Sequence, residues 1–457
     1  MAKLFKPTKK QAPQSAQLQI DKQGYDGRGI ARHQGKLVFV SGALPGESVT
    51  TGSFRSHSRY SETSTRQVLV ASTDRVQADC KFYERCGGCN LQHQHNTAQV
   101  QFKQASVLEQ MQRLGGLTPE TLAAPLLSNP WGYRSRARLG IDRQGRVAFR
   151  ARDSNDFVAI DQCPVLAADL QLLLSGLASL PTQAKECGIS HIELIAADEG
   201  SAAVIRHTRP MTVRALDWLG QLQQQTGAQL WLQGEKAAGL CSLTGDAVDP
   251  RLHYQLEVQG NQAVATHLQL GFHPQDFTQI NRSINQQMVA QALSWLNLQG
   301  TETVLDLFCG IGNFTLPLAS QAARVIGIEA VEAMVLRGRE NALVNGVANC
   351  EFMALDLTAP EAVSDWNQFP VDAVLLDPPR AGAQQAVNWI AQQRVPRILY
   401  VSCDPASLAR DAAILKEQDY RLERLGIMDM FPQTAHVESM ALFVLRSPIN
   451  ASGKHYG

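Results

Sequence analysis

Thr303-Val-Leu-Asp-Leu-Phe-Cys-Gly-Ile-Gly-Asn-Phe314 is a short apolar run followed by a glycine turn and then by an apolar stretch typical of a helix. This order is that of the first βα unit of a nucleotide-binding sheet, in which Gly310 and Gly312 would let the backbone approach a ligand closely. The third glycine of the G-x-G-x-x-G fingerprint is missing, so the segment is not a dinucleotide site of that kind. It predicts a doubly wound α/β domain with a ligand at the glycine turn.

The segments that follow repeat the pattern of an apolar strand that ends in an acid. Arg324 to Glu329 ends 19 residues after Gly310, where a carboxylate can accept hydrogen bonds from ribose hydroxyls, and Cys350 to Asp356 ends in an acid suited to an adenine amino group. A further apolar run leads to Asp377. A single acid of this kind is more often a solvated loop charge. Because ligands bind outside the carboxyl ends of the strands in such sheets, the series predicts one common crevice.

Cys403 lies at the end of another apolar run, Arg397 to Pro405. A buried cysteine at a strand end is the commoner interpretation of a thiol in such a run. In a domain of methyltransferase type, however, a thiol could add to carbon 6 of a pyrimidine and make carbon 5 nucleophilic, which is covalent catalysis. A base must then remove the proton from carbon 5, and the loop before the last strand offers His436 and Glu438. A carboxylate in a dry site has a raised pKa and is the better base.

Four motifs in this order resemble the S-adenosylmethionine-dependent RNA (uracil-5)-methyltransferases: Asp306-x-Phe-Cys-Gly-x-Gly-x-Phe314, Asp377-Pro-Pro-Arg380, Ser402-Cys-x-Pro405 and His436-Val-Glu438. The resemblance implies that Cys403 is the nucleophile and Glu438 the base. It also implies that S-adenosylmethionine is the cofactor and that six residues form its site: Gln279, Phe308, Asn313, Glu329, Asp356 and Asp377. Asparagine often follows the nucleophile in this family, whereas this chain has Asp404. A carboxylate that faced the thiol would raise its pKa, so we expect Asp404 to point away.

A second group of cysteines lies nearer the start of the chain. Cys80-x5-Cys86-x2-Cys89 has the spacing of a metal-ligand cluster, and Cys163 is the best candidate for a fourth ligand. Four thiolates suit zinc as well as an iron–sulfur cluster, so the spacing leaves the metal open. A disulfide pair is not expected in an intracellular chain. The resemblance implies a 4Fe-4S cluster, because the ribosomal-RNA branch of the family has this signature.

The net charge of zero is the sum of a positively charged N-terminal part and a negatively charged remainder. Residues 1–152 contain 23 Lys and Arg against 10 Asp and Glu, and the remaining residues contain 19 against 32. The basic part is suited to nucleic-acid phosphates, and Arg134, Arg136 and Arg138 would alternate on one face of a hairpin that turns at Gly145. Solvated arginines on an edge strand are the alternative. No apolar stretch approaches the length of a membrane span, and the basic start lacks an apolar signal region, so we expect a cytoplasmic chain with no obligate protein partner implied.

We expect three parts in an α/β multidomain chain: an N-terminal barrel (1–76), a central α+β domain with the cysteine cluster (77–268) and a Rossmann-like catalytic domain (269–457). In the first part, short strand-like runs alternate with glycine turns, which predicts a small β-barrel. The stretch from Asp26 to Glu47 resembles a TRAM domain, an OB-like RNA-binding module.

The resemblance implies the bacterial enzyme that methylates carbon 5 of a uridine in 23S ribosomal RNA, because the TRAM module and the cysteine cluster occur together. Transfer-RNA methylation is the alternative within the family. From other classes, the chain could be a non-catalytic RNA-binding iron–sulfur or zinc protein, or an amino-group methyltransferase, as Asp377-Pro-Pro alone would suggest. An amino-group methyltransferase would have no need of Cys403.

Overall fold

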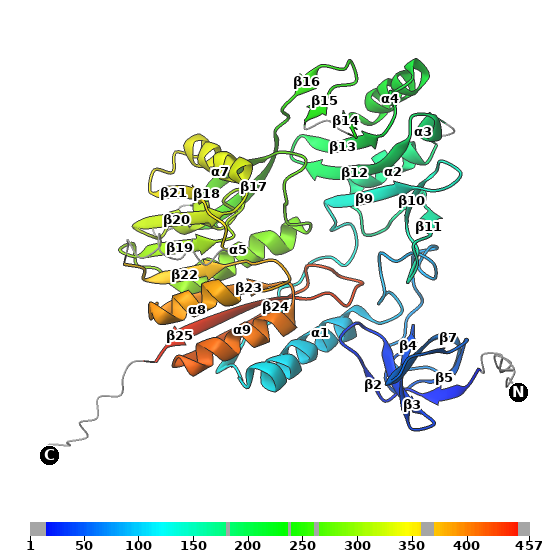
Figure 1. Ribbon diagram of the computed structural model, residues 1–457, viewed down its shortest axis with the longest axis horizontal. Helices are drawn as coiled ribbons and strands as arrows, with labels where there is room; N and C mark the ends of the chain where they lie inside the picture. The colour runs from blue at the N-terminus through cyan, green and yellow to red at the C-terminus, as the bar shows by residue number, and fades with distance from the viewer. Residues whose placement is uncertain (1–14, 180–182, 236–238, 260–264, 358–369, 447–457) are drawn as a thin grey trace, which may run out of the picture. The chain divides into compact units, whose positions relative to one another are not determined.

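The computed structural model describes residues 15–179, 183–235, 239–259, 265–357 and 370–446 (Figure 1). The chain divides into two compact units. The first contains residues 1–103 together with Gln433–Ala435, and the second contains 104–432 and 436–457. The predicted division into three parts at residues 76 and 268 stays a prediction.

The first unit is a curled sheet, as the alternation of short strands and glycine turns predicts. Its strands run in the order β1-β5-β7-β4-β3-β2, with β6 added to β7. The long strand β7 pairs with β4 through its first half and with β5 through its second, so the sheet bends around one apolar core that contains Ile20, Val38 and Val49. The strands are β1 Gln17–Gln19, β2 Lys22–Gln23, β3 Gly29–His33, β4 Lys36–Ser41, β5 Ser48–Thr51, β6 Arg55–Ser56 and β7 Tyr60–Val70.

Helix α1 (Asn96–Gln110) follows the cysteine-rich segment and continues into a single π-helical turn, Met111–Gly115. Gly116 ends this turn in the left-handed conformation, with φ at 61°.

An eight-stranded sheet of the second unit carries the glycine turn. Its order is β21-β20-β19-β22-β23-β25-β24-β8, and the pairs from β21 to β23 are parallel. The strands are β8 Thr121–Leu122, β19 Thr303–Leu307, β20 Arg324–Glu329, β21 Cys350–Ala354, β22 Ala373–Leu376, β23 Arg397–Ser402, β24 Tyr420–Met428 and β25 Glu438–Leu445. The strand order reverses between β19 and β22, so this sheet is doubly wound as predicted.

Helices connect these strands, and because crossovers between parallel strands are right-handed, the reversal of strand order sends them to opposite faces of the sheet. Helices α8 and α9 pack side by side (Figure 1). The helices of this part are α5 Arg282–Leu296, α6 Thr315–Ala319, α7 Glu332–Val344, α8 Gln384–Gln392 and α9 Pro405–Glu417. Antiparallel β25 lies between β23 and β24, so its first residues lie at the edge where the parallel strands end.

The second unit also contains a second eight-stranded sheet. Its order is β11-β10-β9-β12-β13-β14-β15-β16, and a separate hairpin, β17-β18, precedes α5. The elements are β9 Arg136–Ile141, β10 Val147–Arg150, β11 Phe157–Ala159, α2 Ala168–Ala178, α3 Gln183–Glu186, β12 Ile189–Ala197, β13 Gly200–His207, α4 Val213–Thr226, β14 Gln229–Gly234, β15 Leu240–Cys241, β16 Ala247–Val248, β17 Leu252–Gln259 and β18 Ala265–Phe272.

The predicted arginine hairpin is present as β9 and β10, but one of its arginines does not face outward as expected. Arg136 donates hydrogen bonds to the carbonyl oxygens of Pro274 and Asp276 and pairs with Glu193 at 3.3 Å. Arg138, two residues on, is exposed. Arg136 therefore stabilises the loop before α5, which also contains Gln279, and the prediction that it faces RNA phosphates is wrong.

In the described part of the chain, no helix is both long and apolar enough to cross a membrane.

Candidate active site

The predicted nucleophile and base lie side by side because of the register of two strands. Ser402, the last residue of β23, pairs with Ser439 of antiparallel β25, and the Ser439 hydroxyl donates to the Ser402 carbonyl oxygen at 3.3 Å. Cys403 follows Ser402 and Glu438 precedes Ser439, so both leave the sheet at the same edge. Residues separated by 35 positions in the chain thus form one site.

Asp377 joins them from the neighbouring strand. Leu376, the last residue of β22, pairs with Leu307 on one side and with Tyr400 on the other, and the Asp377 N–H donates to the Leu307 carbonyl oxygen at 3.3 Å. The charge of Asp377 acts on the pKa of both Cys403 and Glu438. Cys403, Glu438 and Asp377 therefore lie at the same end of the sheet, as expected, and a common crevice for them stays a prediction.

Burial sets the protonation of the carboxyl groups in this crevice. Glu438 is only 7% exposed, and desolvation, with the charge of Asp377 second, raises its pKa well above the ordinary value. Desolvation also raises the pKa of Asp377 to about 7. His436, the other candidate base, is exposed and packs edge-on against Phe431, with ring centroids 5.8 Å apart. Glu438 is therefore the better placed base.

The Cys403 thiol is neutral in the protein without RNA. Desolvation and then the charges of Glu438 and Asp377 raise its pKa to about 11, whereas Arg380 opposes this shift. A thiolate is the nucleophilic form of cysteine. Substrate binding or a neighbouring carboxylate must therefore promote loss of the thiol proton.

The glycine turn after β19 has the backbone strain of a ligand site. Phe308 adopts a left-handed conformation with φ at 64°, which costs a non-glycine residue about 1–3 kcal/mol. Gly310 has φ at 58°, and a Cβ there would meet only Met334, at 3.3 Å. A Cβ at Gly312 would lie 2.4 Å from Leu316, and the residue has φ at 96°, so packing and backbone conformation both require glycine there.

The acid and amide predicted at the cofactor are held in place by hydrogen bonds. Glu329 accepts from the N–H groups of Gly310 at 3.2 Å and of Val331 at 3.0 Å, which fixes its carboxylate beside the turn. The Asn313 amide exchanges two hydrogen bonds of 2.9 Å with Asn285. These contacts pre-orient both side chains.

Two other predicted cofactor residues are less closely attached to the turn. Asp356 lies two residues beyond β21 and is exposed. Gln279 is half-buried in the loop before α5, where its carbonyl oxygen accepts from the Ser135 hydroxyl at 3.4 Å. Among the residues that the structure describes, its side chain makes no hydrogen bond with the strand-end residues.

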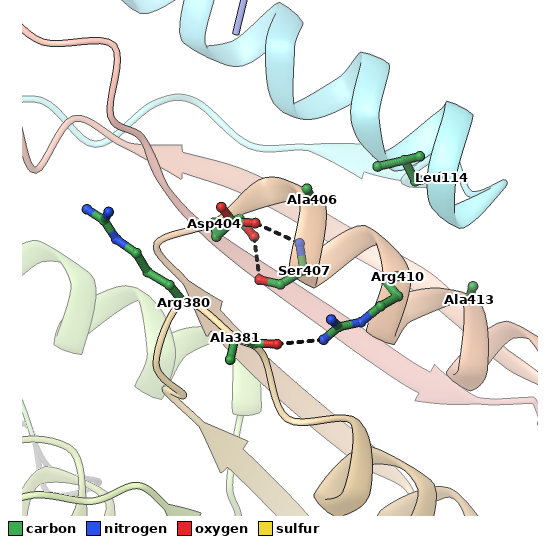
Figure 2. Close-up of a pocket in the computed structure, with 8 residues that line it drawn as sticks. All are labelled: Leu114, Arg380, Ala381, Asp404, Ala406, Ser407, Arg410 and Ala413. Carbon is green, nitrogen blue, oxygen red and sulfur yellow. Dashed lines mark hydrogen bonds between the residues drawn. The ribbon is translucent and has the colours of Figure 1, made fainter. Parts of the chain in front are cut away.

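Asp404 points away from the thiol, as expected. Its carboxylate caps α9 by accepting from the Ser407 N–H at 2.8 Å, within a pocket of about 530 Å³ beside the first turns of this helix (Figure 2). The Ala381 carbonyl oxygen accepts from Arg410 across this pocket. Asp377, Cys403 and Glu438 are not among the residues that line it.

Arg380 lies on the rim of the same pocket, and no role is predicted for it from the sequence. It is exposed, it makes no hydrogen bond or ion pair with the described residues, and its charge lowers the pKa of both Cys403 and Glu438. Its position three residues after Asp377, in the same strand-end loop, was the signal that could have identified it.

The four cysteines predicted as metal ligands are half-buried. Cys80, Cys86 and Cys89 belong to the first unit and Cys163 to the second. Over the described ranges, no three histidine, cysteine, aspartate or glutamate side chains are grouped so that they could hold a metal ion. The prediction that these four thiols bind a metal therefore stays a prediction.

Comparison with known proteins gives the class. The sequence model of the tRNA (uracil-5-)-methyltransferase family matches residues 96–446, and that of the TRAM domain matches residues 15–51. The chain belongs to this family of uracil-5 methyltransferases and carries an N-terminal TRAM domain.

Its relatives point to one member of the family. The chain is 45% identical over 432 residues to the 23S rRNA (uracil(1939)-C(5))-methyltransferase RlmD of Pseudomonas putida, with 93% of each chain covered. It is 43% identical over 452 residues to the protein of the same name from Hahella chejuensis, with 95% of this chain and 98% of the relative covered.

A solved structure shows the same fold. The tRNA (uracil-54, C5)-methyltransferase of Pyrococcus abyssi, in complex with S-adenosyl-L-homocysteine, aligns with a TM-score of 0.71 at 22% identity and covers 94% of this chain and 100% of its own. Because a tRNA enzyme aligns over nearly the whole chain, the domain arrangement alone does not separate ribosomal from transfer-RNA substrates.

The charges around Cys403 predict how its reactivity depends on pH. In RNA-free protein, iodoacetamide alkylation of Cys403 should increase tenfold per pH unit through pH 8 to 10, because the thiolate fraction rises toward a pKa of about 11. Asp377→Asn removes a negative charge and should shift the profile to lower pH. Arg380→Ala removes a positive charge and should shift it to higher pH. Mass spectrometry of the Cys403 peptide measures the rate.

Asp404→Asn is the matched control, because asparagine also caps helices and the Asp404 carboxylate is bound to Ser407. It should leave the alkylation profile unchanged. A wild-type profile that is already flat above pH 7 would contradict the raised thiol pKa.

Proposed function

We propose that the protein transfers a methyl group from S-adenosylmethionine to carbon 5 of uridine 1939 in 23S ribosomal RNA, the position in the names of its relatives. The observation that carries the chemical part of this proposal is the pairing of Ser402 with Ser439, which brings Cys403 and Glu438 together. A nucleophilic thiol beside a buried carboxyl group is the pair that methylation at carbon 5 of a pyrimidine requires. Amino-group methylation would use neither.

The Cys403 sulfur adds to carbon 6 of the uracil, and its proton passes to a neighbouring carboxylate. Asp377, with a pKa of about 7, can accept this proton near neutral pH. The addition moves electron density to oxygen 4 and makes carbon 5 nucleophilic. S-adenosylmethionine, when bound, supplies the electrophilic methyl group that carbon 5 accepts.

Glu438 acts after this transfer. In its ionised form it removes the proton from carbon 5, the electron pair re-forms the double bond between carbons 5 and 6, and the Cys403 thiolate leaves. A raised pKa makes Glu438 a stronger base once it is ionised, and its burial keeps water from the intermediate. The products are 5-methyluridine, S-adenosylhomocysteine and one proton.

Six residues are proposed to hold S-adenosylmethionine: Gln279, Phe308, Asn313, Glu329, Asp356 and Asp377. The glycine turn supports this, since Gly310 leaves room beside the strained Phe308 and Glu329 is fixed by two backbone N–H groups. An oriented carboxylate at the end of the second strand suits ribose hydroxyls. These residues would orient the methyl group toward the uracil.

The RNA substrate is supported by the charge of the N-terminal part and by the TRAM domain. Residues 1–152 have an excess of 13 positive charges, which suits a polyanion. Transfer RNA is the second candidate, because the Pyrococcus abyssi protein that shares the fold is a tRNA enzyme. Identity above 40% over most of the chain favours 23S ribosomal RNA.

A 4Fe-4S cluster on Cys80, Cys86, Cys89 and Cys163 is also proposed. The spacing of the first three cysteines and the family resemblance support it. We derive no catalytic step from the cluster. Its proposed role is to shape the RNA-binding part of the chain.

The first test concerns the nucleophile and the substrate together. In a strain lacking this gene, wild-type protein should restore 5-methyluridine at position 1939 of 23S rRNA. Cys403→Ala should reduce methylation by roughly 10⁴-fold or more, the scale seen when a covalent nucleophile is removed, while it keeps affinity for S-adenosylmethionine. Wild-type protein should also form a denaturation-resistant adduct with RNA that contains 5-fluorouridine.

Methyl label found in transfer RNA and not in 23S rRNA would show that transfer RNA, the second candidate, is the substrate. Substantial turnover by Cys403→Ala would exclude the covalent mechanism.

The second test separates proton removal from methyl transfer. Glu438→Gln should still form the adduct and transfer the methyl group, because both steps precede proton loss. Release of product should slow by about 10²–10⁴-fold, the usual effect of removing a general base. Gel electrophoresis under denaturing conditions measures the methylated adduct. A Glu438→Gln protein that forms no adduct would show that Glu438 has another role.

The third test concerns the metal. Protein purified without oxygen should be brown, with broad visible absorbance and iron and sulfide in about a four-to-four ratio. Cys86→Ser should weaken folding or RNA affinity more than affinity for S-adenosylmethionine. Colourless protein with one equivalent of zinc would identify a zinc site instead.

A further inference from the structure

Three residues of the loop that leads to the base belong to the first unit. Gln433, Thr434 and Ala435 lie between β24 and β25, yet they pack with residues 1–103, whereas the chain on both sides of them belongs to the second unit. Ala435 precedes Glu438 by only three residues. The contacts of these three residues therefore influence the position of Glu438 at the start of β25.

The Gln433 main chain and side chain are both bound. Its carbonyl oxygen accepts from the N–H groups of Asn90 at 3.1 Å and of Leu91 at 2.9 Å. Its own N–H donates to Gln99 Oε1 at 3.0 Å, and Gln99 Nε2 donates back to Gln433 Oε1 at 3.0 Å. Gln99 is fully buried and Gln433 is 4% exposed, so water cannot replace these partners.

Asn90 holds the next part of the loop and, with the same amide, a turn of the TRAM domain. Its Oδ1 accepts from the Ala435 N–H at 2.9 Å, and its Nδ2 donates to the Asp26 carbonyl oxygen at 2.9 Å. At the adjacent Gly27, with φ at 84°, a Cβ would lie 3.1 Å from that of Ala435. Asn90 directly follows Cys89 in the chain.

The backbone of the loop indicates that these bonds are needed. Gln433 has φ at 70°, a left-handed conformation that non-glycine residues adopt rarely. Such a conformation persists where the surrounding contacts over-determine it. Five hydrogen bonds from Asn90, Leu91 and Gln99 do this here.

We propose that Asn90 and Gln99 are positioning residues for the base: they fix the loop at Gln433 and Ala435 and thereby the place from which Glu438 enters the site. This inference rests on the proposed function, in which Glu438 removes the proton from carbon 5. Asn90 and Gln99 touch neither RNA nor cofactor in this role. Loosening the loop should therefore slow the late step and spare the early ones.

The kinetic test uses full-length Asn90→Ala and Gln99→Ala with labelled S-adenosylmethionine and a 23S rRNA transcript. Turnover should fall by about 10–100-fold, since small displacements of a catalytic group have effects of this size. KM for RNA and for the cofactor should stay unchanged, and methylated RNA should accumulate as covalent adduct. Wild-type turnover, or equal losses of adduct formation and cofactor binding, would overturn the proposal.

Two variants separate positioning from general stability. Gln94→Ala removes another buried glutamine of the same segment, whose side chain pairs with Gln23 and not with the loop. It should keep wild-type turnover. Asn90→Asp keeps an oxygen for the Ala435 N–H but places a charged acceptor against the Asp26 carbonyl oxygen, so it should restore only part of the turnover lost in Asn90→Ala. If Asn90→Asp is as slow as Asn90→Ala, the bond to Ala435 is not the one that matters.

Hydrogen exchange tests the contact without any reaction. The Gln433 and Ala435 amides should exchange slowly in RNA-free wild-type protein, and Asn90→Ala should speed the exchange of Ala435 while Gln94→Ala leaves it unchanged. Exchange that is equally fast in the wild type overturns the proposal. If the wild type protects Ala435 but methylates no RNA, the proposed function fails while the contact stands.

Discussion

The antiparallel pairing of β25 between β23 and β24 is the constraint on which the site depends. A parallel sheet alone would bring Asp377 and Cys403 to one edge, but it would leave the start of β25 at the opposite edge. Since β25 runs the other way, Ser439 pairs with Ser402, and the chain enters the sheet where Cys403 leaves it. The strand direction thus decides that a carboxyl group from far along the chain is available to the thiol.

This placement also determines the electrostatic character of the crevice. Asp306 and Glu438 are buried and Asp377 is half-buried at or near the ends of strands of this sheet, and desolvation raises the pKa of each. Asp306 is further held by the Thr315 hydroxyl at 2.6 Å, which limits its shift to a pKa of about 7. Arg380 is the cation whose charge opposes these shifts at Cys403 and Glu438. At rest the raised pKa values favour neutral Cys403 and Glu438, whereas Asp377, with a pKa of about 7, is partly ionised near neutral pH and can accept the thiol proton.

The sequence predicts the strands of the catalytic sheet and their ends, because apolar runs that stop at an acid or a glycine are local signals. The motifs around these residues also predict that Asp404 points away from the thiol. They further predict that Cys403 and Glu438 act together. It does not predict that Arg136 binds the carbonyl oxygens of Pro274 and Asp276, since an arginine on a strand looks the same whether its partner is a phosphate or a distant loop. The role of Gly312 in packing against Leu316 escapes notice for a similar reason, because glycine spacing does not distinguish ligand approach from tight helix contact.

The contact between Gln99 and Gln433 joins residues 334 positions apart. During synthesis the N-terminal unit leaves the ribosome first, yet three of its residues are not made until nearly the whole chain is complete. Until then Gln99 Nε2 can donate to the Leu91 and Gln94 carbonyl oxygens, but Gln99 Oε1 lacks the Gln433 N–H that it accepts from in the complete chain. That bond forms only when the chain closes a loop that contains the entire catalytic domain. The unit that is synthesised first is thus among the last to form all of its contacts. A chain truncated before residue 433 cannot form them.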